Sequence, residues 1–141
     1  MTPEQIVLVQ TSFAQVLPIA DTAAALFYSR LFELDPSLKP LFKGDMAEQG
    51  RKLMATLGVV VNGLTNLDSV LPAASALAKK HVGYGVTADH YAPVGAALLW
   101  TLERGLGAGW TPQLAAAWTD AYTTLSGYMI SEAYGKFEAA E

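Results

Sequence analysis

Apolar residues recur at helical spacing along most of this chain, and no stretch alternates apolar and polar residues as a half-buried strand would. Proline and glycine divide the pattern into segments. Thr2 followed by Pro3 is typical of a helix start, because the threonine hydroxyl caps the first turn and proline is tolerated there. The β-branched run at 59–61 lies inside a helical stripe. The sequence therefore predicts an all-α fold.

The positions of the proline, glycine and capping residues predict about six longer helices and some short pieces. A length of 141 residues indicates a single domain over 1–141. The expected segments are 3–17, 21–34, a short piece at 37–42, 46–63, one that Asp68 or Pro72 starts and Gly83 ends, one that Thr87 caps and that stops near Gly105, and one that Pro112 opens. This number exceeds a four-helix bundle and favours helices that cross at steep angles.

Composition excludes several classes of function. The absence of cysteine excludes disulfides, iron–sulfur clusters and thiolate zinc sites. A net charge of -4 makes nucleic acid a poor partner. The N-terminus has no basic region typical of a secretory signal, and the unbroken apolar stretches are short for a membrane span. We expect a soluble cytoplasmic protein without a membrane partner.

His81 is the residue that most directly suggests chemistry. It ends an apolar stripe of Val70, Ala74 and Leu77, and it is one of only two histidines. An imidazole that faces the core from a helix can be the axial ligand of a buried metal cofactor. A core histidine with ordinary hydrogen bonds is the alternative, and the residues alone leave both interpretations open.

Two other polar residues lie on apolar stripes. Gln49 needs hydrogen-bond partners if it is buried, and the hydroxyl of Tyr28 usually finds one. Gln49 at the edge of its stripe and Tyr28 as an ordinary core residue are the plainer interpretations. Together with His81, however, they fit a cofactor pocket with a ligand on one side and donors on the other. The candidate apolar walls are Phe42, Leu53, Val86, Val94 and Leu98.

The chain resembles the globin family over nearly its whole length. The segments that carry the likeness are LFYSRLFELDPSLKPLF, QGRKLM, LAKKHVGYGV, HYAPVGAALLWTLERGLG and AAWTDAY. It is most similar to bacterial single-domain haemoglobins of the Vitreoscilla haemoglobin and flavohaemoglobin lineage, with a likeness to neuroglobin. The resemblance implies a globin fold, a 3-on-3 helical sandwich around haem b (iron protoporphyrin IX).

The resemblance also implies a role for each candidate residue. His81 matches the proximal iron ligand, Phe42 the phenylalanine that packs on the porphyrin, and Tyr28 and Gln49 the distal residues. Lys52 is placed to pair with a haem propionate, or is simply solvated. The remaining haem contacts are Leu53, Leu77, Val86, Tyr91, Val94 and Leu98, of which Tyr91 matches the tyrosine of a proximal His-Tyr-Glu group in flavohaemoglobins.

The chain departs from its relatives in three respects. Because the distal residue is Gln49 and His90 adjoins Tyr91, no second imidazole is placed to bind the iron as in neuroglobin. The glutamate of the proximal group would fall on Ala133, and Glu132 lies one residue early, about 100° around a helix. We therefore expect that group to be altered. No glycine-rich dinucleotide fingerprint occurs, so we expect no flavin or NAD domain.

The implied function is reversible binding of O2, and of NO and CO, at a pentacoordinate iron, for storage or transport. The alternative is a nitric oxide dioxygenase that converts NO to nitrate and depends on a separate flavin reductase. A helical regulator that has kept the fold without haem is a third, more distant interpretation. Related globins are often monomers or homodimers, and we expect one of these states.

Overall fold

The prediction of an all-α fold is confirmed for the residues that the structure, a computed structural model, describes: 2–42, 45–83 and 90–130. These residues contain no strand. The elements are α1 (Pro3–Val16), η1 (Leu17–Ile19), α2 (Ala20–Leu34), η2 (Pro36–Leu41), α3 (Met46–Asn62), η3 (Gly63–Asn66), α4 (Leu67–Gly83), α5 (Tyr91–Leu106), η5 (Gly107–Gly109) and α6 (Pro112–Ile130), where η marks a 3₁₀ helix.

The starts of α1, η2, α3 and α6 have side-chain caps. Thr2 forms a capping box with Gln5, and the side chains of Asp35, Asp45 and Thr111 accept hydrogen bonds from backbone N–H groups in the first turns of η2, α3 and α6. Of the two predicted starts of α4, Asp68 is within one residue of the observed start at Leu67, whereas Pro72 lies inside the helix. The predicted cap Thr87 lies outside the described residues.

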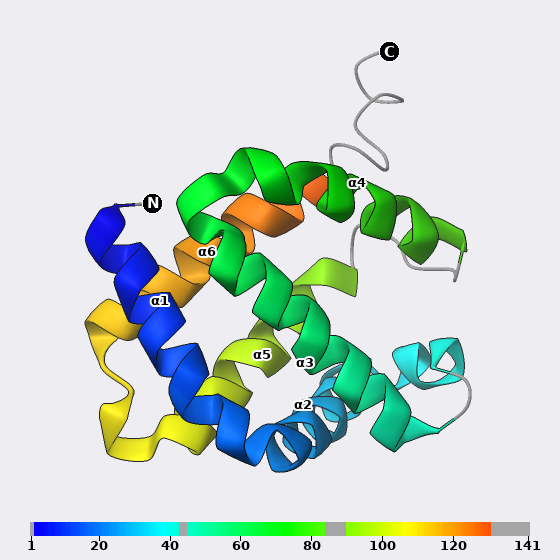
Figure 1. Cartoon of the computed structure of the whole chain (residues 1–141). Helices are drawn as coiled ribbons and strands as arrows, with labels where there is room; N and C mark the ends of the chain where they lie inside the picture. The colour runs from blue at the N-terminus through cyan, green and yellow to red at the C-terminus, as the bar shows by residue number, and fades with distance from the viewer. Residues whose placement is uncertain (1, 43–44, 84–89, 131–141) are drawn as a thin grey trace.

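The helices form two packed layers (Figure 1). α1, α3 and α4 lie on one side, and α2, α5 and α6 lie on the other. α2 contacts both α3 and α5, while α6 contacts α1, α4 and α5. In the view of Figure 1, α3 and α4 diverge from their junction at η3, so the first turn of α3 and the last turn of α4 lie at the open end of a V.

Two apolar clusters form the core. The larger joins α1, α2, α5 and α6 around fully buried side chains such as Val9, Val16 and Leu31. Within it the indole N–H of Trp118 donates to the hydroxyl of Ser12 at 2.8 Å, which links α6 to α1. A smaller cluster holds α4 against α5 and α6, and its buried members are Ala74, Ala78, Tyr91 and Met129.

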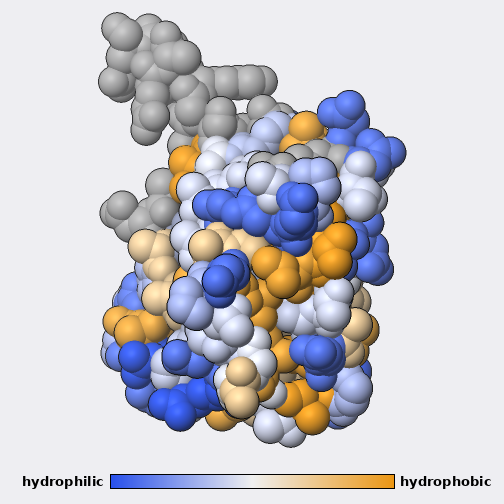
Figure 2. All heavy atoms as spheres, turned by 90° about the vertical axis from the view of Figure 1, so that its left-hand side faces the viewer, coloured by the Kyte–Doolittle hydropathy of each residue, from blue (hydrophilic) through white to orange (hydrophobic). Residues whose placement is uncertain are grey.

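One stretch, Pro3–Leu34, is long and apolar enough to cross a membrane by length and composition. In this fold it is divided into α1, η1 and α2, and its apolar residues Val9, Phe13 and Leu31 belong to the core. Figure 2 views the molecule from the side on which α1 lies, where hydrophilic residues interrupt the hydrophobic surface. Only 28% of its most apolar window is buried, and Val7, Leu17 and Ile19 are exposed, so the absence of a membrane partner stays a prediction.

Gly50 lets α3 approach α2 closely. A Cβ at this position would lie 2.8 Å from the Cβ of Ala24 on α2, closer than two carbon atoms pack. Since Gly50 directly follows Gln49, this contact also sets the distance between α2 and the turn of α3 that carries Gln49. The same helix has a second glycine, Gly58, whose nearest neighbour would be the Phe13 ring at 3.7 Å, an ordinary packing distance.

These two glycines give a matched test of the close approach. Gly50→Ala should lower the free energy of unfolding by about 1–2 kcal/mol, because overpacking outweighs the gain in helix propensity. Gly58→Ala should leave it unchanged or raise it by up to about 1 kcal/mol. Urea unfolding followed by circular dichroism measures both. Equal effects of the two substitutions would contradict the role of Gly50.

Candidate functional site

His81 lies in the last turn of α4, half-buried, and its ring meets the ring of Tyr91 edge-on at a centroid separation of 6.5 Å. Val70 and Ala74 on the same stripe are buried, and Leu77 packs against the smaller cluster. Burial lowers the pKa of His81 below its ordinary value. The imidazole is therefore neutral at neutral pH, which is the form that binds a metal through a ring nitrogen.

No three histidine, aspartate or glutamate residues among 2–42, 45–83 and 90–130 gather closely enough to hold a metal ion. A metal at His81 would therefore have at most one further ligand of these types among the described residues. A porphyrin supplies four nitrogens of its own and needs one imidazole from the protein. The donor set at His81 thus fits haem iron better than a bare ion.

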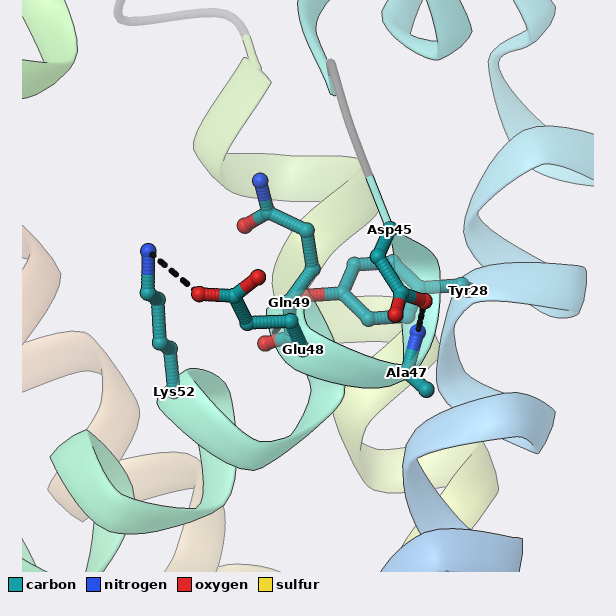
Figure 3. A network of polar contacts seen from close by, with 6 residues as sticks. All are labelled: Tyr28, Asp45, Ala47, Glu48, Gln49 and Lys52. Atoms are coloured by element: carbon teal, nitrogen blue, oxygen red, sulfur yellow. Dashed lines mark hydrogen bonds and ion pairs between the residues drawn. The ribbon is translucent and has the colours of Figure 1, made fainter.

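Tyr28 and Gln49 come together where α2 passes α3 (Figure 3). The Tyr28 hydroxyl, on a side chain that is only 7% exposed, donates to the backbone carbonyl of Gln49 at 3.3 Å. The Gln49 side chain extends from the same turn of α3. The structure therefore brings together the two residues predicted for the distal side, but it pairs the tyrosine with the backbone of Gln49, which the sequence did not predict.

Aromatic rings surround the Tyr28 side chain. The ring of Phe42, at the end of η2, lies 5.2 Å from it, and the ring of Phe32 lies 6.1 Å from it. Burial among these groups raises the pKa of Tyr28 to about 12. The hydroxyl thus keeps its proton, and with it the ability to donate, well above neutral pH.

The other predicted contacts lie in different surroundings. Leu98 is buried, and Leu53 and Val94 pack against the larger cluster half-buried. Lys52 is exposed and pairs with Glu48 at 3.7 Å (Figure 3), the arrangement expected of a solvated lysine. Val86 lies outside the described residues. Ala133 and Glu132, the positions at issue for the proximal glutamate, also lie outside them.

Leu53 and Leu98 also line a small apolar cavity of about 10 Å³, barely enough for one water-sized molecule. Its lining residues come from α1, α2, α3, α5 and α6 and include neither Tyr28 nor Gln49. The other lining residues are Phe13, Val16, Ala23, Phe27, Met54, Leu57, Thr101, Leu102 and Trp118.

Sequence reasoning missed a second tyrosine contact, on the opposite side of the site. The hydroxyl of Tyr122 on α6 donates to the backbone carbonyl of Tyr91, the first residue of α5, at 2.5 Å. A Cβ at Gly95 would lie 2.6 Å from the Tyr122 ring. A glycine within the apolar stripe of a helix was the available signal, because it often marks a close tertiary contact.

The structure thus shows a neutral imidazole on α4 and a buried phenol on α2 beside Gln49 of α3, the groups that the sequence predicts for the two sides of a haem site. The sequence profile of the family described as Globin matches residues 25–129. This chain belongs to the globin family, and the globin fold predicted from the sequence is confirmed. Membership of this family implies haem binding.

The curated relatives include flavohemoproteins, which are longer than this chain. The chain is 30% identical over 143 residues to that of Bordetella parapertussis and 32% identical over 124 residues to that of Xylella fastidiosa. These alignments cover 99% and 86% of this chain but 36% and 31% of the relatives. The chain thus spans about a third of their length.

Solved structures agree with the fold. A bacterial globin from Campylobacter jejuni matches 97% of this chain and 99% of its own with a TM-score of 0.82 at 24% identity, which bears on the fold alone. An engineered carbene transferase from Rhodothermus marinus, a presumed nitric oxide dioxygenase, matches 100% of this chain and 99% of its own with a TM-score of 0.86 at 25% identity.

The ligand role predicted for His81 is tested by its removal. His81→Ala should give a protein that is pale or loses haem rapidly, since the iron loses its bond to the protein. His90→Ala, which changes the only other histidine, should bind haem normally. Haem transfer to an apo-globin acceptor, followed by absorbance, measures both. A His81→Ala protein with wild-type spectra would contradict the assignment.

Proposed function

We propose that this protein binds O2 reversibly at a pentacoordinate haem iron held by His81. The observation that carries the proposal is the Tyr28–Gln49 contact, which brings a buried donor next to a residue with a side-chain amide. The neutral, half-buried imidazole of His81 supports a ligand on the other side. We propose haem b as the cofactor, with Phe42 packed on the porphyrin.

Haem iron, when present, supplies the atom to which O2, NO or CO binds. Tyr28 and Gln49 act on the ligand through hydrogen bonds. The present bond of Tyr28 to the Gln49 carbonyl, at 3.3 Å, is long for a hydroxyl donor and therefore weak. The hydroxyl can exchange this acceptor for a ligand oxygen that carries negative charge, a bond worth about 1.5–3 kcal/mol. The Gln49 amide can add a second donor, so O2 release should be slow.

We propose nitric oxide dioxygenation as the second candidate function. In that reaction O2, NO and one electron give nitrate, and a separate flavin reductase would supply the electron. A site that holds O2 for long gives NO time to arrive and react with it. The flavohemoprotein relatives, together with the presumed dioxygenase from Rhodothermus marinus, also favour this candidate.

We also propose a cellular location and an oligomeric state for the protein. The acidic composition, with a net charge of -4, and the lack of cysteine suit a cytoplasmic gas-binding protein without a nucleic-acid partner. We propose a monomer or homodimer.

Tyr28→Phe tests the distal donor. The substitution removes one charge-assisted hydrogen bond, so O2 dissociation should accelerate at least tenfold, as about 1.5 kcal/mol implies. Stopped-flow O2 displacement by CO measures the rate. CO dissociation serves as the control and should change less, because bound CO carries less negative charge. Gln49→Leu should have a smaller effect of the same sign. An unchanged O2 off-rate in Tyr28→Phe would remove the tyrosine from the proposal.

Steady-state NO consumption discriminates between the two candidates. With a generic flavin reductase and NADH, a dioxygenase should convert many equivalents of NO to nitrate for each haem. Nitrate yield and NO electrode traces measure turnover, and the rate of ferric haem reduction sets the expected ceiling. A single turnover despite rapid ferric reduction would contradict dioxygenation and support O2 binding alone.

A further inference from the structure

Two arginines from neighbouring helices meet at the ring of Trp100, which is half-buried at the surface between α2 and α5. The guanidinium carbon of Arg104 on α5 lies 4.4 Å from the ring centroid, and that of Arg30 on α2 lies 5.4 Å from it. Both are cation–π contacts, each worth about 0.5–1 kcal/mol at an exposed site. The indole therefore holds two cations in place where another molecule can reach them.

Three further side chains extend this surface. Glu33 and Leu34 lie one turn beyond Arg30 on α2. Glu103 lies one turn beyond Trp100 on α5. All three are exposed, and Leu34 is among the exposed large apolar residues, at 42%. The resulting surface is called the Trp100 face, and its members are Arg30, Glu33, Leu34, Trp100, Glu103 and Arg104.

The charges of the Trp100 face are balanced in sign but only partly paired within the chain. Arg30 contacts Glu33 at 3.4 Å, which is longer than the roughly 2.7–2.9 Å of a strong charge-assisted bond. Glu103 and Arg104 form no ion pair with the residues that the structure describes, and side chains that are adjacent in sequence do not face each other on a helix. Groups of both signs thus remain available to a partner.

The arrangement of these charges is complementary to a second copy of the same chain. A row of contacts runs from Glu33 through Arg30 and Trp100 to Arg104. A twofold axis midway between Glu33 and Arg104 places each of them beside its counterpart in the other copy, so a single axis creates two ion pairs. A partner whose surface carries charges of one sign would meet like charges as well as opposite ones on this face.

The residue types of the Trp100 face also suit an interface. Tryptophan and arginine are enriched among the residues that carry most of the binding energy between proteins. The half-buried indole and exposed Leu34 can form an apolar centre, with the charged groups around it as a polar rim. Nε of Arg30 is buried and makes no hydrogen bond to the described residues, so this part of the cation is already withdrawn from water before a partner arrives.

We propose that the protein forms a homodimer through the Trp100 face, in which Glu33 of each copy pairs with Arg104 of the other around the two indole rings. Arg30 follows Tyr28 by two residues, about 200° around α2, so the face points away from the Tyr28–Gln49 contact. Dimerisation therefore leaves the distal side open. The proposal does not depend on the ligation of haem iron by His81.

Sedimentation equilibrium of the full chain tests the proposal over about 1 µM to 1 mM, a range that covers weak and moderate association. The wild type should show a monomer–dimer equilibrium. Glu33→Arg and Arg104→Glu should each weaken dimerisation at least tenfold, because either change places like charges at both twofold-related pairs.

The decisive sample is an equal mixture of the two variants. The Glu33→Arg copy carries arginine at both positions, and the Arg104→Glu copy carries glutamate at both. Each of the two pairs then contains one glutamate and one arginine, so the mixture should recover a dimer although neither variant dimerises well alone.

Lys79→Glu is the control for charge, because Lys79 is exposed on α4, in the other layer, and its substitution changes the net charge as Arg104→Glu does. It should leave the dimer unchanged, and circular dichroism verifies the fold of every variant. A wild type that stays monomeric over the whole range would overturn the proposal. A dimer that survives both charge reversals, or a mixture that fails to recover one, would exclude the Trp100 face as the interface.

Discussion

The missing side chain at Gly50 is the constraint on which the distal side depends. It lets α3 approach α2 until a Cβ would meet that of Ala24 at 2.8 Å. At that separation the hydroxyl of Tyr28 on α2 donates to the backbone carbonyl of Gln49 in α3. Phe42, which follows α2 through η2, packs on the same ring. One close helix contact therefore assembles a donor, an amide and an aromatic wall from three elements.

Burial then determines the charge of the site. It raises the pKa of Tyr28, an acid, and lowers the pKa of His81, a base, and both shifts favour the neutral form. The phenol keeps a proton to donate, and the imidazole keeps a lone pair to share with a metal. The exposed Lys52 and Glu48 neutralise each other at 3.7 Å. A site of this kind favours a neutral gas that gains partial negative charge only once it is bound.

The sequence predicts features set by neighbouring residues, such as helix starts, and misses contacts between residues that are far apart in the chain. The Thr2 cap acts within one turn, so the start of α1 is read correctly, and α3 begins at the predicted residue 46. Pro72 was wrongly considered as a helix start, because a proline near the beginning of a long helix is tolerated as well. The pairing of Tyr28 with a backbone carbonyl could not be predicted, since a hydroxyl does not reveal its partner in sequence. The need for glycine at Gly50 and Gly95 comes from Ala24 and Tyr122, which the fold brings against them.

The two sides of the site are built by different helices. α2 and α3 supply Tyr28 and Gln49, whereas α4, α5 and α6 supply His81, Tyr91 and Tyr122. α5 and α6 also contribute to the larger core cluster, against which Tyr122 packs, whereas Tyr91 belongs to the smaller one. Residues that share no contacts contribute nearly independently to a free energy. The distal donors can therefore set how long a ligand is held, while the proximal contacts set how the imidazole is held. In this arrangement a globin can alter its gas chemistry on one side without rebuilding the other.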